Sequence, residues 1–321
     1  MNCPVCLNPA TFPAKLTGRD VLFETTTKTF TLSGCPACGC LFIDPLPGER
    51  ELAGFYPTQY WWKASSGILK SLEGAYRKMA LRDHVAFISR AAQGSSPRLL
   101  DVGCGSATLL GLMKQRGFQV QGFDSSAEAA GIAKSESGVN VVVGSRLQDA
   151  GFKNESFDLV TLFHVMEHVT DPRSVLAEVR RLLRPAGRLV LQVPNIESWQ
   201  FRLFGVRWYG LDVPRHVINY SNQAMQRLLA ESGFKVRRTR HFNLRDNAPA
   251  LASSLFPSLD PVSRSVRQRQ RNETERAALS WLRHALYLGV VVAVQPFAIA
   301  ESAAGKGATI VVEAEKATLK L

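Results

Sequence analysis

Two aspartates and two glycines lie close together in the sequence and could hold a nucleotide-like cofactor. Residues 99–107 read LLDVGCGSA, which places Asp101, Gly103 and Gly105 at alternate positions, and Asp124 ends the next apolar segment. Glycines let the backbone approach a ligand, and an acid after the second strand can accept hydrogen bonds from ribose hydroxyls. A dinucleotide site would carry a third glycine to seat the pyrophosphate, and none follows here. The pattern therefore predicts a cofactor that carries no phosphate.

Four of the six cysteines form two Cys-Pro-x-Cys pairs, and these are Cys3, Cys6, Cys35 and Cys38. Four thiolates are the ligand set of a tetrahedral structural zinc site, and such a site is closed to substrates. The intervening residues 11–33 can form a hairpin with a turn at 18–20, so we predict a zinc ribbon without a catalytic role. A redox Cys-x-x-Cys pair is the alternative, but it would not need a duplicate. Cys40 is interpreted as a bystander.

The elements that must position these residues alternate between strands and helices. A helix is expected over 108–116 after the glycines, and the strand over 119–123 ends at Asp124. Further strands are expected at 139–143, 157–163, 188–193, 235–242 and 308–314. Such alternation predicts an α/β fold with a doubly wound, mostly parallel sheet of seven strands. Ligands bind beyond the carboxyl ends of these strands, so the glycine turn, Asp124 and Phe163 are expected on one rim.

Two longer segments complete a set of four motifs in a known order. Residues 156–172 read SFDLVTLFHVMEHVTDP, and residues 175–195 read VLAEVRRLLRPAGRLVLQVPN. Together with the glycine turn, they make residues 98–234 resemble the class I S-adenosylmethionine-dependent methyltransferases, in particular the branch of the ubiquinone-biosynthesis O-methyltransferases. The resemblance implies a Rossmann-like methyltransferase sheet and S-adenosylmethionine as cofactor. It implies that the residues holding this cofactor are Asp101, Gly103, Gly105, Asp124 and Phe163.

A methyltransferase mainly has to align its acceptor with the methyl donor, and a base helps when the acceptor is a hydroxyl. Residues 208–216 read WYGLDVPRH and resemble the segment that covers the acceptor pocket in the same branch. We predict that His216 is the base and that Arg215 contacts an anionic acceptor, with a structural hydrogen-bonding role for His216 as the alternative. His168 is a second candidate for the base, but with Glu167 it can also tie the strand end to the next helix.

On these grounds the chain divides into a zinc ribbon, an aromatic linker with N-terminal helices, and a methyltransferase domain, at residues 1–45, 46–96 and 97–321. The aromatic residues Phe55, Tyr56, Tyr60, Trp61 and Trp62 are expected to wedge one module against another, with a wall of the substrate pocket as the alternative. An insertion at about 245–303 combines arginines with the apolar stretch 285–300. As a helix this stretch would reach about 24 Å, less than the roughly 30 Å hydrocarbon core, so it is expected not to span a bilayer. It fits either a buried helical hairpin or an interfacial element beside a basic patch.

Composition and charge narrow the class of protein and of partner. The 321 residues are 45% hydrophobic and 21% charged, which is typical of a globular protein. The N-terminus lacks the basic-then-apolar pattern of a signal peptide, so we expect a cytoplasmic location, with contact to the inner face of the membrane as an option. The formal net charge of +12 favours an anionic partner such as a membrane surface, a phosphorylated acceptor or RNA. The sequence does not specify an oligomeric state.

Three functions fit these observations. We favour an S-adenosylmethionine-dependent methyltransferase that acts on a small molecule, a sugar or a lipid-linked biosynthetic intermediate. One alternative is an RNA methyltransferase that uses the zinc ribbon and the basic surface to bind RNA, although the aromatics do not alternate with arginines as in a nucleic-acid groove. The other alternative is a non-catalytic, zinc-stabilised scaffold that keeps the fold.

Overall fold

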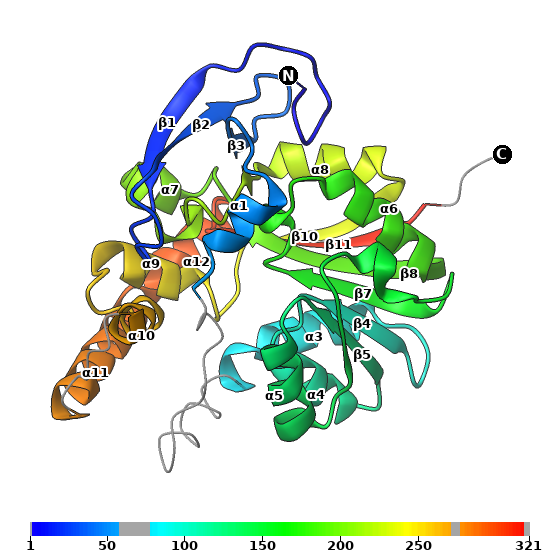
Figure 1. Ribbon diagram of the computed structural model, residues 1–321. Coiled ribbons are helices and arrows are strands. Elements are labelled where there is room, and N and C mark those ends of the chain that lie inside the picture. Colours follow the sequence, from blue (N-terminus) through cyan, green and yellow to red (C-terminus); the bar gives the residue numbers. More distant parts are fainter. Residues whose placement is uncertain (1, 58–77, 271–276, 318–321) are drawn as a thin grey trace. The chain divides into compact units, whose positions relative to one another are not determined.

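The structure is a computed structural model that describes residues 2–57, 78–270 and 277–317 (Figure 1). The chain divides into two compact units, each assembled from three separate segments. Unit 1 comprises residues 1–62, 194–224 and 240–310, and unit 2 comprises residues 63–193, 225–239 and 311–321. The part of the expected aromatic wedge at 60–62 lies outside the described residues.

Unit 2 contains most of a seven-stranded sheet with the strand order β10-β11-β8-β7-β4-β5-β6 (Figure 1). In that order, the strands are Phe234–Arg240, Thr309–Lys316, Leu183–Pro194, Phe157–Phe163, Arg98–Val102, Gln119–Asp124 and Val141–Val143. The five strands from β8 to β6 pair in parallel, and Val102 lies between Leu162 of β7 and Phe123 of β5. This topology confirms the predicted α/β fold with a Rossmann-like methyltransferase sheet.

Several strands differ from their expected limits, most of all β8 and β6. β8 begins at Leu183 instead of Arg188, because Leu183 already pairs with Phe157 of β7. The Pro-Ala-Gly segment that follows is an irregularity in the strand, and pairing resumes at Arg188. β6 is shorter than predicted and starts at Val141.

Two helices of unit 2, α5 and α6, begin at side chains that cap them. Ser126 Oγ accepts a hydrogen bond from Ala129 N at the start of α5, and Asp171 Oδ1 accepts one from Ser174 N at the start of α6. The helices and 3-10 helices here are α3 (Arg82–Ala91), α4 (Thr108–Lys114), α5 (Ala127–Ser137), η1 (Leu147–Ala150), η2 (Met166–His168), α6 (Pro172–Leu182) and α8 (Asn222–Glu231). Helices α3 and α4 bury Ile88, Leu110 and Met113 against Leu99 and Leu159 of the sheet, which fixes the strand ends on which the site depends.

Unit 1 contains a second sheet, with the strand order β1-β2-β3-β9. These strands are Ala14–Arg19, Thr29–Gly34, Leu41–Ile43 and Ile218–Asn219. The predicted hairpin is present, but the turn expected at 18–20 is wrong, because Gly18 pairs with Phe30 inside the hairpin. Residues 20–28 make the connection, and Asp20 organises it by accepting hydrogen bonds from Phe23 N and Thr25 N. The fourth strand, β9, comes from a segment far along the chain, so the N-terminal hairpin is completed by the residues that follow His216.

The rest of unit 1 is mostly helical. Its helices and 3-10 helices are α1 (Glu49–Gly54), α7 (Trp199–Phe204), η3 (Gly205–Arg207), η4 (Tyr209–Leu211), α9 (Asn247–Leu255), α10 (Pro261–Gln270), α11 (Ala277–Ala293) and α12 (Gln295–Ala303). Helices α9 to α12 form the insertion between β10 and β11. Ala248 and Ala252 of α9 pack against Tyr287 and Val291 of α11 and Ala298 of α12.

The apolar stretch at 285–300 belongs to a longer helical segment than predicted. The segment Ala278–Ala303 has 26 residues, and its most apolar window of 18 residues has a mean hydropathy of 1.5, so by length and composition alone it could cross a membrane. The expectation that it is too short is wrong, because the helix starts well before residue 285. Only 22% of its most apolar window is buried, which also contradicts the buried helical hairpin.

Candidate functional site

Asp124 lies at the carboxyl end of β5, where the sequence predicts a cofactor-binding acid. Its side chain is buried, with Oδ2 accepting a hydrogen bond from Gly105 N at 2.8 Å and Oδ1 accepting one from Ser126 N at 2.9 Å. Burial raises the pKa of this carboxyl above its ordinary value, and the backbone N–H groups of Ser126 and Gly105 oppose that rise. Each carboxylate oxygen has a second lone pair, which suits a ligand with two neighbouring hydroxyls.

The glycine turn between β4 and α4 requires glycine for two reasons. Gly103 has a φ of +72°, and a Cβ there would lie 2.6 Å from Val165 Cγ2. Gly105 also has a positive φ, of +51°, and donates the hydrogen bond to Asp124. Ala107 adopts the left-handed conformation as well, with a φ of 54° just before α4. An L-residue pays about 1–2 kcal/mol for this conformation, so alanine is tolerated here at a cost that glycine would avoid.

Asp101 and Phe163 lie on neighbouring strands. Asp101 is buried in β4 and accepts a hydrogen bond from the Thr161 hydroxyl of β7 at 2.6 Å. Phe163 ends β7, and its ring meets the His84 ring edge-on with centroids 4.9 Å apart. Because β7, β4 and β5 are adjacent and parallel, their carboxyl ends meet at one edge of the sheet. The structure therefore brings the five predicted cofactor residues to the same rim of unit 2.

A chain of hydrogen-bonded polar side chains on this rim, buried except for the half-buried His164, was not predicted from the sequence. His84 Nε2 lies 2.8 Å from Gln192 Oε1, and Gln192 Nε2 donates to His164 Nε2 at 2.7 Å. With Nε2 accepting, the proton of the His164 ring is on Nδ1, which lies 3.0 Å from Glu167 Oε1 and donates to it. His164 also has a positive φ of 56°, a strained conformation in the loop that follows Phe163. The only sequence feature that points to this chain of side chains is the i, i+3 spacing of His164 and Glu167, which allows their side chains to contact each other.

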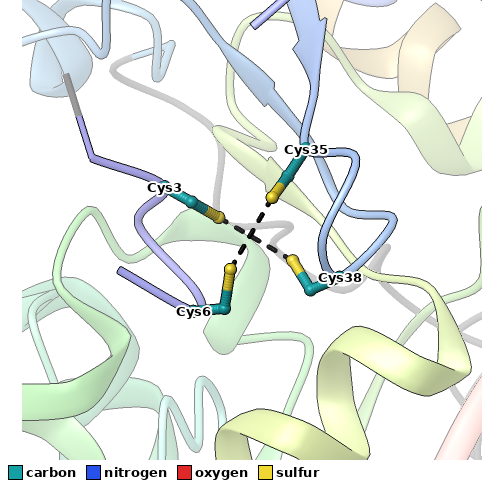
Figure 2. A group of neighbouring side chains, drawn as sticks. All are labelled: Cys3, Cys6, Cys35 and Cys38. Atoms are coloured by element: carbon teal, nitrogen blue, oxygen red, sulfur yellow. Dashed lines mark hydrogen bonds between the residues drawn. The ribbon is translucent and has the colours of Figure 1, made fainter. Parts of the chain in front are cut away.

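Four cysteine side chains of unit 1 point toward a common centre, as Figure 2 shows. Their Sγ atoms all lie within 4.8 Å of one another, with 3.7 Å between Cys3 and Cys38 and 3.6 Å between Cys6 and Cys35. A zinc ion with four bonds of about 2.3 Å to sulfur places its ligands roughly 3.8 Å apart, so the spacing fits a tetrahedral ion. It is far too long for disulfides, and all six cysteines are free thiols. The buried thiols thus form a group that could hold a metal ion.

The two cysteine pairs sit in turns of the same geometry. Leu7 N donates to Cys3 O and Gly39 N donates to Cys35 O, with a positive φ at both Leu7 and Gly39. Cys35 N then donates to Cys40 O at the end of the second turn. This turn brings Cys40 Sγ to 3.5 Å from Cys38 Sγ and 3.6 Å from Cys3 Sγ. Cys40 is therefore a close neighbour of the thiol group, which its interpretation as a bystander did not anticipate.

His216 lies in unit 1, directly before β9. It is 8% exposed, and its Nδ1 donates to Gly210 O at 2.9 Å. A donating Nδ1 leaves Nε2 as the basic nitrogen of the neutral ring, and this atom lies 3.9 Å from Asp212 Oδ2. His168, the other candidate base, lies in unit 2, where it is half-buried at the end of η2.

Arg215 does not contact an anionic acceptor, and that expectation is wrong. Its side chain is 0% exposed and its Nη1 and Nη2 donate to both carboxylate oxygens of Asp20 at 3.0 and 2.8 Å. Its Nε donates to Asp212 Oδ1 at 2.9 Å, Nη1 also donates to Phe55 O, and the guanidinium lies 4.4 Å from the centre of the Phe23 ring. Burial would lower the pKa of Arg215, but Asp212 and Asp20 raise it. The arginine instead ties the β1–β2 connection to the segment that carries His216.

A second buried network in unit 1 surrounds Glu301 of α12. Gln200 Nε2 donates to Glu301 Oε1 at 2.6 Å, and Trp208 Nε1 donates to Gln200 Oε1 at 3.3 Å. Burial raises the pKa of Glu301 to about 7, and the hydrogen bond from Gln200 opposes this shift. No sequence pattern singled out Glu301, because Gln200, which donates a hydrogen bond to its carboxyl, lies 101 residues away along the chain.

A family model described as a methyltransferase domain matches residues 74–239, which is just over half of the chain. The chain belongs to this methyltransferase family. A ubiquinone biosynthesis O-methyltransferase from Pectobacterium atrosepticum is 31% identical over 179 residues, which cover 53% of this chain and 72% of that protein.

Solved structures similar to this methyltransferase have low sequence identity. The cyclase SpnF is 17% identical, with a TM-score of 0.48 over 83% of this chain and 90% of that chain. An S-adenosylmethionine-dependent methyltransferase from Methanosarcina mazei is 16% identical, with a TM-score of 0.46 over 72% of this chain and 97% of that chain. The fold assignment rests on the strand order of this protein itself.

The family assignment agrees with the chemistry of the rim. The protein is an S-adenosylmethionine-dependent methyltransferase, as predicted from the four motifs. S-adenosylmethionine fits this rim for two reasons. The glycine turn lacks the third glycine that seats a phosphate, and the buried Asp124 carboxyl has lone pairs left to accept further hydrogen bonds. A cavity of about 320 Å³ also exists in unit 2, but it lies between α3 and the C-terminal end of α4, and none of the predicted cofactor residues lines it.

Proposed function

We propose that this methyltransferase transfers a methyl group from S-adenosylmethionine to a hydroxyl of a small molecule, a sugar or a lipid-linked intermediate in the cytoplasm. The observation that carries the proposal is the buried Asp124 carboxyl, held by two backbone N–H groups at the carboxyl edge of the sheet. The acceptor class is supported by the relative from Pectobacterium atrosepticum, whose name describes O-methylation in ubiquinone biosynthesis.

In this proposal, the rim of unit 2 binds the cofactor. Asp124 accepts hydrogen bonds from the two ribose hydroxyls, Gly103 and Gly105 allow the backbone to approach, and Phe163 lies beside the cofactor. The hydrogen bond from the Thr161 hydroxyl keeps the Asp101 side chain in position. S-adenosylmethionine, when bound, supplies a methyl group activated by the sulfonium charge. The protein's contribution is alignment, which is worth about 7–11 kcal/mol in favourable systems.

We assign His216 the role of general base for the acceptor hydroxyl. The hydrogen bond from Nδ1 to Gly210 O orients the ring and leaves Nε2 as the proton acceptor. Arg215, the next residue back, is anchored by Asp20 and Asp212, which holds the backbone that carries His216. His168 is the second candidate for the same role.

The four thiolates of Cys3, Cys6, Cys35 and Cys38 hold a structural zinc ion in this proposal. Support comes from their spacing and burial, which suit a tetrahedral closed site. The ion takes no part in methyl transfer and stabilises the two turns that carry the cysteines. The linker at 46–96 then connects this ribbon to the methyltransferase domain at 97–321, with its insertion at about 245–303.

The decisive experiment is calorimetric titration of purified, metal-analysed protein with S-adenosylmethionine and S-adenosylhomocysteine. We expect micromolar binding at one site, followed by transfer of labelled methyl to glycan, lipid-linked or other small acceptors. Absence of binding by folded, zinc-loaded protein would overturn the proposal in favour of the scaffold. Transfer to RNA alone would contradict the proposed acceptor class.

The base is tested by the variant His216→Asn. The asparagine amide can still donate to Gly210 O, but it offers no basic nitrogen in place of Nε2. We expect kcat to fall by about 10²–10⁴-fold, the usual contribution of a general base, with unchanged affinity for S-adenosylmethionine. Wild-type kcat in this variant would remove His216 from the role and leave His168 to be tested in the same way.

A further inference from the structure

Helices α11 and α12 expose an apolar face to solvent. We define this apolar face by its most exposed large side chains, which are Trp281, Leu282, Leu286, Leu288, Val292 and Ile299. Their exposed fractions run from 46% for Leu288 to 70% for Val292. Soluble proteins rarely leave large apolar side chains exposed in such a continuous row.

The polarity of this helical segment is inverted relative to that of a soluble surface helix. Two of its polar groups face the protein: Tyr287 Oη lies 3.1 Å from Ser253 Oγ, and Ser302 Oγ donates to His241 O at 3.0 Å. The acid of the segment, Glu301, is 0% exposed. The side chains turned to solvent are the apolar ones, so the surrounding medium that suits this face is not water.

The apolar face continues onto α7. The Trp199 ring lies 5.9 Å from the Phe297 ring of α12, so the two helices are in contact. In Figure 1, α7 and α12 accordingly lie near each other within unit 1. Residue Leu203 of α7 is 63% exposed, and Val206 of η3 is 39% exposed.

The exposed charged residues in the α7 and η3 part of this surface are basic. In the described parts of segments 194–224 and 240–310, none of the acidic residues is exposed, whereas Arg202 and Arg207 are; the exposed acids of unit 1, among them Glu24, Glu49 and Glu51, lie in its N-terminal segment. Arg202 and Arg207 belong to α7 and η3, next to the exposed Leu203 and Val206. An apolar surface bordered by arginines is complementary to anionic lipid headgroups over acyl chains.

We propose that the apolar face of α11–α12, together with α7 and η3, docks this protein on an anionic lipid bilayer, with the helices lying in the plane of the interface. The segment lies on the surface instead of crossing, because its other side is packed against Ala248 and Ala252 of α9. If two copies met through this surface, the arginines of one copy would lie near those of the other and repel them. Anionic lipid headgroups would instead neutralise the positive charge of these arginines. The inference is independent of the methyl acceptor, because lipid docking and cofactor binding use different residues.

The test is flotation of the full-length protein with vesicles of phosphatidylcholine alone and of phosphatidylcholine with phosphatidylglycerol. We expect binding to the anionic vesicles that weakens at high salt, and at most weak binding to phosphatidylcholine. Emission of Trp281 should shift to shorter wavelength on binding, and the shift should disappear in Trp281→Phe. The double variant Leu286→Ser/Val292→Ser should lower the apparent lipid affinity at least about tenfold, since each change removes apolar contact.

The matched control is Val21→Ser/Met79→Ser, which changes two exposed apolar residues outside this surface. It should bind vesicles as the wild type does. Equal binding by the two double variants, or no binding by the wild type, would overturn the proposal. Self-association that Leu286→Ser/Val292→Ser abolishes, without vesicle binding, would assign the face to a second copy. Affinity for S-adenosylmethionine, measured on the same samples, separates failure of this proposal from failure of the proposed function.

Discussion

At the scale of single residues, Asp124 is the side chain on which the cofactor site depends most. Its carboxyl is buried and accepts hydrogen bonds from the backbone N–H groups of Gly105 and Ser126, and a ligand that uses the remaining lone pairs would explain this burial. A buried acid of this kind is common at functional sites, because burial works against stability and needs a reason.

Asp124→Ala should weaken binding of S-adenosylmethionine at least about 100-fold, since two hydrogen bonds to a charged group contribute about 1.5–3 kcal/mol each. Zinc content should not change, because the cysteines belong to unit 1. Calorimetry on the variant and on Glu136→Ala, an exposed acid at the end of α5, measures the effect and its control. Unchanged affinity in Asp124→Ala would overturn the placement of the ribose.

Glu301 predicts a pH dependence of stability. The pKa of Glu301 in the folded protein is about 7, above the ordinary 4.5. The stability that this carboxyl contributes is therefore fully present below pH 4.5 and is lost as the pH rises through 7. Glu301→Gln is neutral at every pH, and its advantage over the wild type in free energy of unfolding should grow by roughly 2–3 kcal/mol between pH 5 and pH 8. Urea titrations at both values check this. Parallel pH profiles for the two proteins would contradict it.

At the scale of elements, the connection between β1 and β2 is held to the η4–β9 segment by a buried ion pair. Burial alone would raise the pKa of Asp20, but Arg215 lowers it to about 2 through hydrogen bonds and charge. The stability that this carboxylate contributes is therefore present above pH 3.8 and is lost as the pH falls toward 2. The loop is thus part of the support for His216.

Asp20→Asn leaves Arg215 with a reduced countercharge in a site without water contact. Breaking a buried pair in this way costs about 3–5 kcal/mol, so we expect a clear fall in Tm by calorimetry. Lys28→Ala breaks an exposed pair between the same loop and Glu51, with side chains 64% and 42% exposed, and should cost less than about 1 kcal/mol. Similar Tm values for the two variants would show that the Asp20–Arg215 pair does not hold the loop.

At the scale of the whole molecule, the two units divide the chemistry between them. The cofactor rim belongs to unit 2, and the thiol group and His216 belong to unit 1. The thiol group is also linked to the segment that contains β9, because Ser221 Oγ donates a hydrogen bond to Cys38 O and β9 pairs with β3. Metal loss should therefore disturb the His216 segment before it disturbs the cofactor rim.

Removal of zinc with a strong chelator should abolish methyl transfer while leaving the affinity for S-adenosylmethionine unchanged. Metal analysis should give about one zinc per chain for the wild type and for Cys40→Ser, and none for Cys38→Ser, because four thiolates complete a structural site. Calorimetry and metal analysis of the three proteins check this. Zinc loss in Cys40→Ser would make Cys40 a ligand and require a different set of four.

The sequence by itself determined the features that depend on neighbours along the chain. The strand–turn–helix around Gly103, the end of β5 at Asp124 and the two cysteine turns follow from local spacing, because backbone geometry and metal ligation act over a few residues. The parallel sheet followed from the alternation of elements, since parallel strands need a crossover between them.

Only the tertiary structure decided the features that depend on distant partners. Arg215 is a reasonable anion contact by type, but its partner Asp20 lies 195 residues away and buries it completely. The same holds for β9, which completes the N-terminal sheet, and for the helix of residues 278–303, whose polar side chains turn inward. Local spacing carries no information about such pairs, because burial and partner choice arise when segments far apart in the sequence pack together.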